Sequence, residues 1–522
     1  MDKKRAGYLT RTGLFLLLIE MTVLSACGPG TGTPTPIPSP TPGPGVYHKD
    51  FGITWSSTYY EDPHRNPQLA ADAGATWDRW DFHWQWIMRS SPPAWAGSWP
   101  TSYNYDQAVQ EAQRTTPPLN ILAILNGPLL DHPDYGPGGS WEQFVRAVQE
   151  RYGNRISAWE LGNETGFVHE DPDDPNSRLP LTPKEYIQAL RTACEVLGQD
   201  STIILGSPVA QVGLSLANEG LNYPRRPTFV KTYKEIIDRI KRSSDLQDCV
   251  DAIGVHTYLR APWSYWIIKG IYEYVHDTWP NPRFWITESG LATGHEGVTC
   301  SSAEQGSDCE NEQVQANYVI QQYAMAKQAF GEINQPPGTG VIFHHCLKDG
   351  CGGTYGLVSE TGDQRWPSFY AAWLTTQLLE EATFDREESG NGYKHLIFRS
   401  KHGEIVHALW AITPQTVTVP FRPVASHQVW YYRQREAEFY FAGGSPPLLT
   451  ITGELQVTLP GTESRSGKNE ADPYHAETGN VGWPSNYFVG GETILLVEGP
   501  PGGGGTPEGS LSPVCEGGRL VG

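Results

Sequence analysis

The sequence predicts an α/β fold, a (β/α)8 TIM barrel, followed by an all-β sandwich domain. Eight short runs of apolar or β-branched residues alternate with helical patterns between residues 51 and 347. Beyond residue 380 the pattern changes to period-two segments bounded by turns. A chain of 522 residues has room for both domains. The eightfold alternation favours a closed barrel, and a doubly wound open sheet is the alternative.

The barrel is predicted over residues 47–383. Its helices begin at Ser140, at Thr182 and at Glu310. Thr182 can cap its helix, and Pro183 suits the first helical position because its missing N–H is not needed there. The C-terminal ends of all barrel strands open onto one face, so polar residues at those ends should converge on one site. The eight predicted strands are 51–58, 76–84, 120–127, 156–164, 202–210, 250–258, 282–290 and 338–347.

The second domain, residues 384–499, is predicted to be a β-sandwich. Within it, the polar stretch 461–487 is predicted to be a long loop, and residues 500–522 beyond it a disordered tail. The predicted strands are 393–400, 404–411, 415–421, 427–434, 448–460 and 492–499.

The first residues have the features of an export signal. Basic residues at positions 3–5 precede a mostly apolar run from Leu14 to Leu24, and small residues then lead to Cys27. This ending resembles a bacterial lipoprotein signal over residues 1–27, in which Cys27 is lipidated; an ordinary secretory signal is the alternative. Residues 28–46 are rich in Pro, Thr and Gly and predict an extended linker. We therefore expect an exported protein that is either lipid-anchored, with no other membrane contact, or secreted.

Composition narrows the partners. The formal net charge of −20 argues against nucleic acid, whose phosphates would be repelled. The 18 tryptophans point toward carbohydrate, because indole rings stack on the apolar faces of sugars as well as filling cores.

The cysteines predict disulfides rather than a metal site. In an oxidising compartment the short-range pairs Cys300–Cys309 and Cys346–Cys351 are the best candidates. Cys194–Cys249 is possible only if helix and strand ends meet, and Cys515 is left over. No CxxC pair is present, so no zinc site is expected.

Two glutamates end predicted strands four and seven. Glu164 closes the run 156–164, and Glu288 lies near the end of 282–290. Glycoside hydrolysis needs one carboxyl that gives a proton to the leaving oxygen and one ionised carboxylate that attacks the anomeric carbon. Two strand-end glutamates at opposed barrel positions fit that requirement. The alternative is that each glutamate only pairs with a cation at the strand mouth.

Residues 48 to about 383 resemble clan A of the retaining glycoside hydrolases. These are (β/α)8 enzymes with the acid/base on strand four and the nucleophile on strand seven. The stretches that carry the resemblance are 74–87, 105–113, 159–164, 251–258, 285–290 and 354–373.

The resemblance implies a role for six residues. Glu164 would be the acid/base, Glu288 the nucleophile and Asn163 the donor to the sugar 2-hydroxyl. Arg79 and Tyr258 would orient Glu288, and His256 completes the His-x-Tyr of strand six. A neighbouring arginine also keeps a carboxylate ionised on physical grounds. Two alternatives remain open: Arg79 forms a structural ion pair with Asp78 or Asp81, and His256 is a core histidine.

The chain departs from the clan pattern in two places. Thr165 follows Glu164 where many members have proline, and His344 and His345 stand where a tryptophan often ends strand eight. Adjacent strand residues point to opposite sides, so one of the two histidines is expected to pack in the core. The acidic run 169–174 is either a calcium ligand set or, as we expect, a solvated loop. Candidate stacking platforms, each as compatible with core packing, are Trp55, Trp84, Trp95, Trp99, Trp263, Trp266 and Trp366.

We therefore expect a retaining glycoside hydrolase that acts on an extracellular oligo- or polysaccharide, with no metal or cofactor and as a monomer. The resemblance implies a β-linked or arabinofuranosyl-type substrate. The sandwich is expected to be a structural partner of the barrel. Two non-enzymatic alternatives are a surface lipoprotein that captures sugars without cleaving them and a scaffold protein with a degenerate barrel.

Overall fold

A computed structural model describes residues 49–57, 66–97, 103–126, 134–164, 182–208, 229–258, 260–294, 310–350, 354–421, 427–464 and 489–499. Every described residue belongs to one compact unit within residues 40–522. Several predictions concern residues outside the described ranges: the signal with Cys27, the linker, Trp99, the acidic run 169–174, the pair Cys300–Cys309 and the tail.

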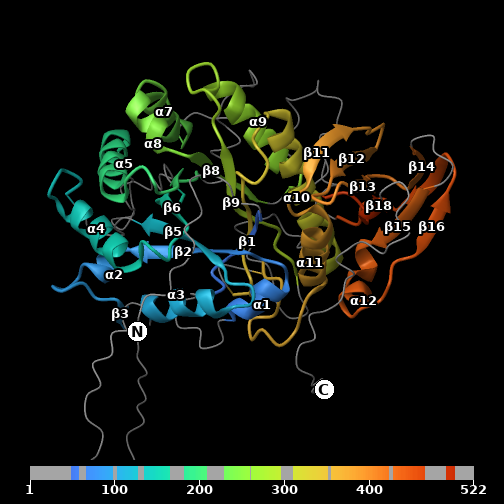
Figure 1. Ribbon diagram of the computed structural model, residues 1–522, viewed down its shortest axis with the longest axis horizontal. Coiled ribbons are helices and arrows are strands. Elements are labelled where there is room, and N and C mark those ends of the chain that lie inside the picture. Colours follow the sequence, from blue (N-terminus) through green and yellow to red (C-terminus); the bar gives the residue numbers. More distant parts are fainter. Residues whose placement is uncertain are drawn as a thin grey trace, which may run out of the picture. The chain divides into compact units, whose positions relative to one another are not determined.

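Eight parallel strands close into a barrel, which confirms the predicted fold and excludes the open sheet (Figure 1). Each strand falls within one of the eight predicted runs. Around the barrel the order is β1-β10-β9-β8-β7-β6-β5-β2. The strands are β1 Phe51–Thr54, β2 Trp77–His83, β5 Asn120–Asn126, β6 Ala158–Leu161, β7 Ile203–Leu205, β8 Ala252–Tyr258, β9 Phe284–Gly290 and β10 Ile342–His344.

Helices connect consecutive strands, and their caps follow from the sequence. Thr182 caps its helix in a full capping box with Glu185, and Pro183 is the first helical residue, as predicted. The long helix predicted to begin at Glu310 is α10, which begins at Glu312 and has Asn311 as its N-cap. The helices of the barrel are α1 Pro67–Asp72, α2 Trp84–Ile87, α3 Tyr105–Arg114, α4 Ser140–Tyr152, α5 Pro183–Leu197, α7 Phe229–Lys241, α8 Ser244–Cys249, α9 Trp263–Val275, α10 Glu312–Glu332 and α11 Pro367–Leu379. Two short strands, β3 Ala96–Gly97 and β4 Tyr103–Asn104, pair antiparallel.

A buried apolar layer fills the interior of the barrel near the start of its strands. Its indole rings meet edge to face, with the centroids of Trp77 and Trp285 5.2 Å apart. This layer closes the barrel below the polar residues that come later along the same strands. Its members are Trp77, Leu122, Ala158, Ile204, Ala252, Trp285, Val341 and Phe343.

Beyond the barrel, two antiparallel sheets pack face to face, as predicted. One has six strands in the order β11-β12-β13-β18-β15-β16, and the other pairs β14 with β17. A buried cluster that includes Leu409 and Leu496 from the first sheet and Val419 and Leu459 from the second fills the space between them. The strands are β11 Thr383–Glu387, β12 Tyr393–Arg399, β13 Ile405–Ala411, β14 Gln415–Pro420, β15 His427–Arg433, β16 Leu448–Ile451, β17 Glu454–Leu459 and β18 Ile494–Glu498.

The sandwich differs from the prediction at two points. The predicted strand 448–460 is two strands in different sheets, because Gly453 turns the chain at φ 92° between β16 and β17. Strand β11 was not predicted. Its residues are half-buried or exposed at the edge of the six-stranded sheet, so they carry no alternating apolar pattern.

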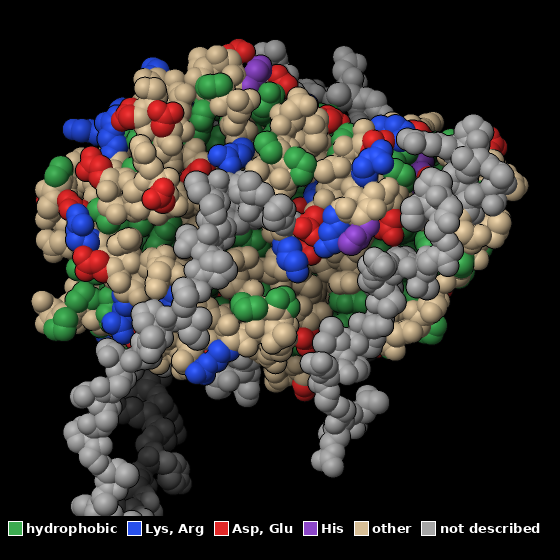
Figure 2. Space-filling view, viewed as in Figure 1, with side chains coloured by type: hydrophobic (Ala, Val, Ile, Leu, Met, Phe, Trp, Pro, Cys, Tyr) green, Lys and Arg blue, Asp and Glu red, His purple; other side chains and the backbone are tan. Residues whose placement is uncertain are grey.

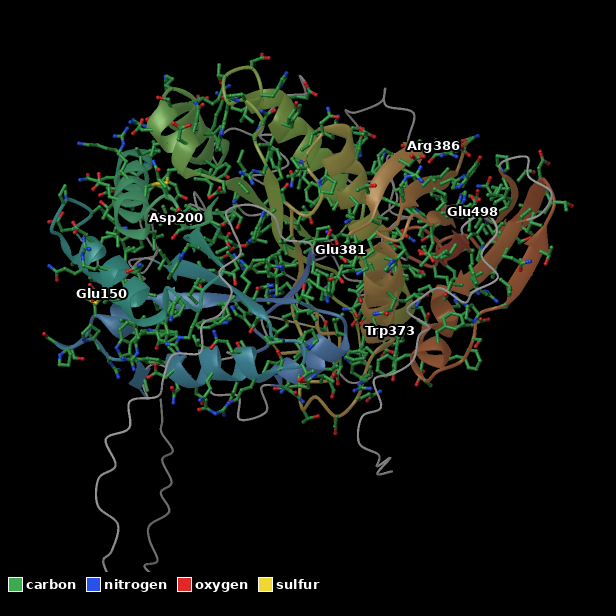
Figure 3. All side chains as sticks on the ribbon, viewed as in Figure 1. Glu150, Asp200, Trp373, Glu381, Arg386 and Glu498 are labelled. Carbon is green, nitrogen blue, oxygen red and sulfur yellow. A yellow bond between two sulfur atoms is a disulfide. The ribbon has the colours of Figure 1, made fainter. Side chains whose placement is uncertain are left out.

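The second face of the six-stranded sheet packs against the barrel. Its buried residues share one apolar cluster with the barrel helices. Helix α10 lies at this boundary: the amide of Gln321 donates to the Gly491 carbonyl at 2.9 Å, and Thr493 N donates to Asn317 at 3.1 Å. The short helix α12, Ala437–Phe441, packs against α11, whose Trp373 is labelled in Figure 3. The rings of Phe441 and Trp373 meet edge to face. These contacts support the structural role expected for the sandwich.

The disulfide that the sequence left possible is present. Cys194 near the end of α5 is bonded to Cys249 at the end of α8, with Cα atoms 6.1 Å apart. Cys346 is also disulfide-bonded, but its partner lies outside the described residues, so the pairing with Cys351 stays a prediction.

Acidic and basic side chains are interspersed on the visible face (Figure 2). In the described part of the chain, no helix combines the length and the apolar character needed to cross a bilayer.

A half-buried carboxyl at the end of α11 gives a stability prediction. Burial raises the pKa of Glu380 to about 8, and the nearby charge of Asp50 adds to the increase. Among the described residues no hydrogen bond satisfies Glu380 Oε1. The unfolded chain ionises this carboxyl near its ordinary pKa, so the wild-type protein loses stability as pH rises from about 4.5 to 8. The amide that Glu380→Gln introduces cannot ionise. The variant should gain on the order of 4 kcal/mol relative to wild type between pH 4.5 and 8.

Urea unfolding of both proteins at pH 4.5 and pH 8 measures this gain. Asp72→Asn, a change at a carboxylate exposed on α1, is the control and should show no comparable pH-dependent gain. An equal stability difference between variant and wild type at both pH values would contradict the prediction.

Candidate active site

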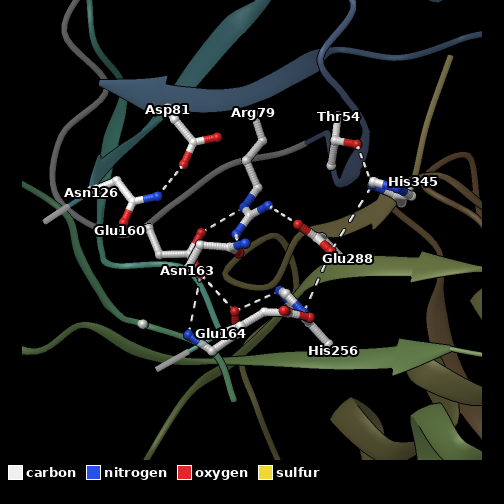
Figure 4. Close-up of polar contacts among 12 residues, drawn as sticks. Thr54, Arg79, Asp81, Asn126, Glu160, Asn163, Glu164, His256, Glu288 and His345 are labelled. Atoms are coloured by element: carbon white, nitrogen blue, oxygen red, sulfur yellow. Dashed lines mark hydrogen bonds and ion pairs between the residues drawn. The ribbon is translucent and has the colours of Figure 1, made fainter. Parts of the chain in front are cut away.

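Arg79 organises the polar cluster above the apolar layer (Figure 4). The side chain is fully buried in β2. Its Nη1 lies 2.6 Å from Glu288 Oε1, and its Nε lies 2.6 Å from Glu160 Oε2. Nη2 donates to Asn163 Oδ1 at 2.8 Å. The open alternative, an ion pair with Asp78 or Asp81, is not what the described residues show. The Asp78 carboxylate accepts from the loop after β1, and the Asp81 carboxylate accepts from Trp55 and Asn126. The Arg79 guanidinium therefore binds Glu288 of β9, Glu160 of β6 and Asn163, which follows β6.

A β-bulge aims Glu288 into the barrel. Strand β8 pairs Val255 with Ile286 and then His256 with Glu288, so Thr287 is an extra residue in β9. Ile286 packs outward toward the helices, and the extra residue returns Glu288 to the inward side. There it pairs with Arg79 and accepts a short hydrogen bond from the Tyr258 hydroxyl.

The surroundings of Glu288 keep it ionised. Burial by itself raises the pKa of this carboxyl, but the electrostatic interactions with His256, Arg79 and His345 and the Tyr258 hydrogen bond outweigh burial and lower the pKa to about 2. In return, the charges of Glu160 and Glu288 outweigh the effect of burial on Arg79 and raise the pKa of its guanidinium. Glu288 is therefore an anion throughout the physiological pH range.

Glu164 faces the same space from the turn after β6. Positive φ angles at Gly162 (78°) and Glu164 (49°) turn the chain sharply there. The Glu164 side chain is 41% exposed, against 4% for Glu288. A carboxylate oxygen of Glu164 lies within 4.8 Å of one of Glu288, and His256 Nδ1 lies 3.6 Å from the first and 3.5 Å from the second. The two glutamates thus line one site, the inner one shielded and the outer one open to solvent.

The side-chain amide of Asn163 is oriented so that its N–H groups can donate hydrogen bonds. Because its Oδ1 accepts from Arg79, its amide N–H groups remain to donate.

The adjacent histidines His344 and His345 point to opposite sides of the barrel wall, as alternation along a strand requires. His344 is buried and its Nε2 bonds the Tyr355 carbonyl, and burial lowers its pKa to about 4. His345 lies in the site: its Nδ1 is 3.2 Å from the Thr54 hydroxyl and 4.0 Å from Glu288 Oε2. Its ring packs edge-on against Trp55 and Tyr258. His345 therefore forms a wall of the site where the clan often has tryptophan.

Comparisons with known proteins give structural relatives and no sequence relatives. No protein-family model matches the chain, and no curated protein matches it. Among similar solved structures, a family 39 glycoside hydrolase from the gut symbiont Bacteroides cellulosilyticus WH2 has 16% identity and a TM-score of 0.55, covering 87% of this chain and 81% of its own. A family 51 arabinofuranosidase from Xanthomonas axonopodis pv. citri has 12% identity and a TM-score of 0.51, over 88% and 98%. A family 30 endoxylanase from Clostridium papyrosolvens C71 has 11% identity and a TM-score of 0.51, over 88% and 98%.

The shared property is the fold. At these identities the comparisons confirm the predicted architecture, a barrel followed by a sandwich, and the chemistry must be argued from this chain's own residues.

The tryptophans expected as stacking platforms differ in position. The ring of Trp55 packs edge-on against His345, which lies in the site. The indole N–H of Trp55 donates to Asp81 Oδ2 at 3.3 Å. Asn126 Nδ2 bonds the other oxygen of Asp81 at 2.9 Å. Trp84 donates to the Ser140 carbonyl, and Trp366 donates to Asp349. The ring of Trp95 packs against Tyr152 and Arg151, that of Trp263 against Arg260, and that of Trp266 against Tyr265.

A metal centre fits the cluster poorly. Of the residues the structure describes, one set of three potential ligands is close enough to share an ion: Glu164, His256 and Glu288. Both oxygens of Glu288 already accept, from Arg79 and from Tyr258, and the guanidinium places a positive charge beside them. The expectation of no metal or cofactor stays a prediction.

Sequence reasoning missed two residues of the cluster, Glu160 and Ser207. Glu160 accepts from Ser207 Oγ at 3.0 Å as well as from Arg79, and both side chains are buried. A signal for Glu160 was present, since residues 158, 160 and 162 share one strand face and a charged residue between Ala158 and Gly162 needs a buried partner. Nothing in the sequence distinguishes Ser207 from other serines.

Proposed function

We propose that the protein is a retaining glycoside hydrolase that cleaves a β-linked or arabinofuranosyl-type saccharide by double displacement. The spacing of Glu164 and Glu288, within 4.8 Å between carboxylate oxygens, carries the proposal. Retaining enzymes hold the two carboxyls about 5–5.5 Å apart, whereas inverting enzymes leave about 6.5–9.5 Å for a water molecule.

The environments of the two glutamates divide their roles. Glu288 is the nucleophile, because Arg79 and Tyr258 keep it ionised and hold its oxygens in place. Glu164 is the acid/base, because it has no ion pair with Arg79 and its solvent-exposed position gives access to a leaving group and then to water. Asn163 donates to the sugar 2-hydroxyl, as the resemblance implies.

In the first step Glu288 attacks the anomeric carbon while Glu164 protonates the departing oxygen. The product is a glycosyl-enzyme ester with inverted configuration. In the second step Glu164 takes a proton from water, which attacks the same carbon and restores the original configuration. Each bond made at the carbon is matched by one broken, and the proton that Glu164 gives to the leaving group is replaced by the one it takes from water.

We further propose that the protein acts outside the cytoplasm on extracellular carbohydrate, as a monomer attached through a lipid on Cys27 or released. The N-terminal pattern of residues 1–27 supports export. A solved structure with a TM-score of 0.53 and 8% identity is a conserved exported protein from Bacteroides fragilis.

Proton NMR of the first product tests the mechanism. The protein is incubated with a panel of β-linked and arabinofuranosyl oligosaccharides, and the anomer is identified before mutarotation. We expect product with the substrate's own anomeric configuration. An inverted first product would overturn the double displacement. Binding without release from any panel member would instead favour a non-catalytic sugar-capturing lipoprotein.

A further inference from the structure

A series of buried hydrogen bonds links Arg79 to His256 through Glu160 and Ser207. Glu160 Oε2 pairs with Arg79, and Glu160 Oε1 accepts from both the backbone N–H (3.3 Å) and the hydroxyl (3.0 Å) of Ser207. Ser207 Oγ lies 2.6 Å from His256 Nε2. The side chains of Glu160, Ser207 and His256 have no exposed surface. Bulk water therefore cannot replace any of these hydrogen bonds.

This series fixes the direction of each hydrogen bond. Glu160 is paired with a guanidinium, so it is ionised and can only accept. A hydroxyl has one proton, and Ser207 uses it on Glu160. In the contact with His256 the oxygen must therefore accept, and the proton must be on Nε2 of the imidazole.

The other ring nitrogen faces the reaction site. His256 Nδ1 is buried and makes no hydrogen bond within the described residues, although a carboxylate oxygen of Glu164 and one of Glu288 lie 3.6 Å and 3.5 Å away. In a neutral ring with its proton on Nε2, this nitrogen has a lone pair and no hydrogen.

We propose that Ser207, anchored by Glu160, is a positioning residue that fixes neutral His256 as the Nε2–H tautomer and so keeps a bare Nδ1 beside Glu164. The inference rests on the proposed function, which needs Glu164 to hold a proton before the first step. An Nδ1–H would donate to the Glu164 carboxylate and favour the ionised form. A bare Nδ1 cannot donate, so the carboxylic acid is retained for the leaving group.

The charged and titratable groups that face His256 come from five elements. Glu164 follows β6, which also contributes Glu160; Glu288 lies on β9; Arg79 on β2; Tyr258 on β8; and His345 follows β10. Ser207, which is neither charged nor titratable, supplies the contact that distinguishes the two ring nitrogens, because its hydroxyl contacts Nε2.

NMR of histidine labelled with ¹⁵N tests the tautomer without using activity. Disappearance of its signals in His256→Asn assigns the ring. At a pH where the ring is neutral, we expect wild type to have its proton on Nε2, and Ser207→Ala to shift the tautomer ratio toward Nδ1–H by about fivefold or more, as expected for loss of one hydrogen bond. Ser264→Ala is the matched control, because Ser264 is also buried but its hydroxyl donates to the backbone carbonyls of Ala261, just before α9, and of Gln322 in α10. A proton on Nδ1 in wild type, or no shift in Ser207→Ala, would overturn the proposal.

A kinetic readout separates positioning from structural damage. Ser207→Ala should lose about tenfold in kcat/KM on substrates with poor leaving groups, which need the proton, and less than about threefold on activated aryl glycosides, which do not. Ser207→Thr keeps a hydroxyl and should restore most of the loss. Equal losses on both substrate types would overturn the positioning role. If no substrate is ever cleaved, the proposed function fails, while the NMR result still decides the tautomer.

Discussion

Glu288→Ala is expected to reduce turnover of any substrate by on the order of 10⁴–10⁶-fold, the scale seen when an enzyme loses its nucleophile. The carboxylate is 4% exposed and its pKa is lowered to about 2 despite burial, so it is a preorganised anion. Without it the glycosyl-enzyme ester cannot form. The variant should still fold, because Arg79 keeps its ion pair with Glu160 and no buried positive charge is left unpaired.

Azide distinguishes loss of the nucleophile from general damage. The alanine leaves space on the side from which Glu288 attacks, and an azide ion bound there can displace the leaving group in a single step. Glu288→Ala with azide should therefore yield a glycosyl azide of inverted configuration, measurable by NMR. Asp50→Asn is the control: Asp50 is another buried carboxylate that pairs with a cation, Lys327, but it precedes β1 at the opposite end of the barrel. It should retain turnover per folded molecule and show no azide effect. Full activity of Glu288→Ala would end the proposed function.

The fold could be predicted because its signals are local. Barrel strands such as β5 and β7 are buried and have the sequence of a short apolar run, and the helices between strands have caps such as Thr182. Strand β11 gave no such signal because it is an exposed edge. The split between β16 and β17 depends on a turn whose partners in each sheet are distant in sequence.

Six residues of the site could be predicted, because the resemblance assigned each of them to a position on or just after a barrel strand. Arg79, Asn163, Glu164, His256, Tyr258 and Glu288, all expected from the resemblance, lie in one cluster in the structure. The bulge at Thr287 was not predictable, because strict alternation of β9 from Trp285 would turn Glu288 toward the helices. The Ser207 contact with His256 also depends on the relative positions of β7 and β8, which no local pattern encodes.

The polar cluster has a structural cost that the barrel offsets by pairing. Arg79, Glu160 and Glu288 are removed from water together, which is expensive unless each charge has partners. Two carboxylates share one guanidinium, and Asn163, Tyr258 and Ser207 supply further hydrogen bonds. The arrangement leaves Glu164 as the glutamate of the pair outside the ion-pair network, which is what an acid/base that exchanges protons with solvent requires.

Glu164→Ala should accordingly behave differently from Glu288→Ala. On substrates with poor leaving groups we expect a loss of about 10²–10⁴-fold, the usual contribution of general acid catalysis. On activated aryl glycosides the first step no longer needs the proton, but the second step still lacks its base. The glycosyl-enzyme should then accumulate, giving a burst of aryl alcohol in a stopped-flow absorbance trace and an added mass in the intact protein spectrum.

Azide should rescue this variant with the opposite stereochemistry. It needs no base, so it attacks the accumulated glycosyl-enzyme directly, and two successive inversions give a glycosyl azide of retained configuration. The pair of variants forms a matched test, because the two carboxylates line the same site and differ in which side of the anomeric carbon they serve. If both variants yielded the same azide anomer, the division of roles between Glu164 and Glu288 would be wrong even if both proved essential.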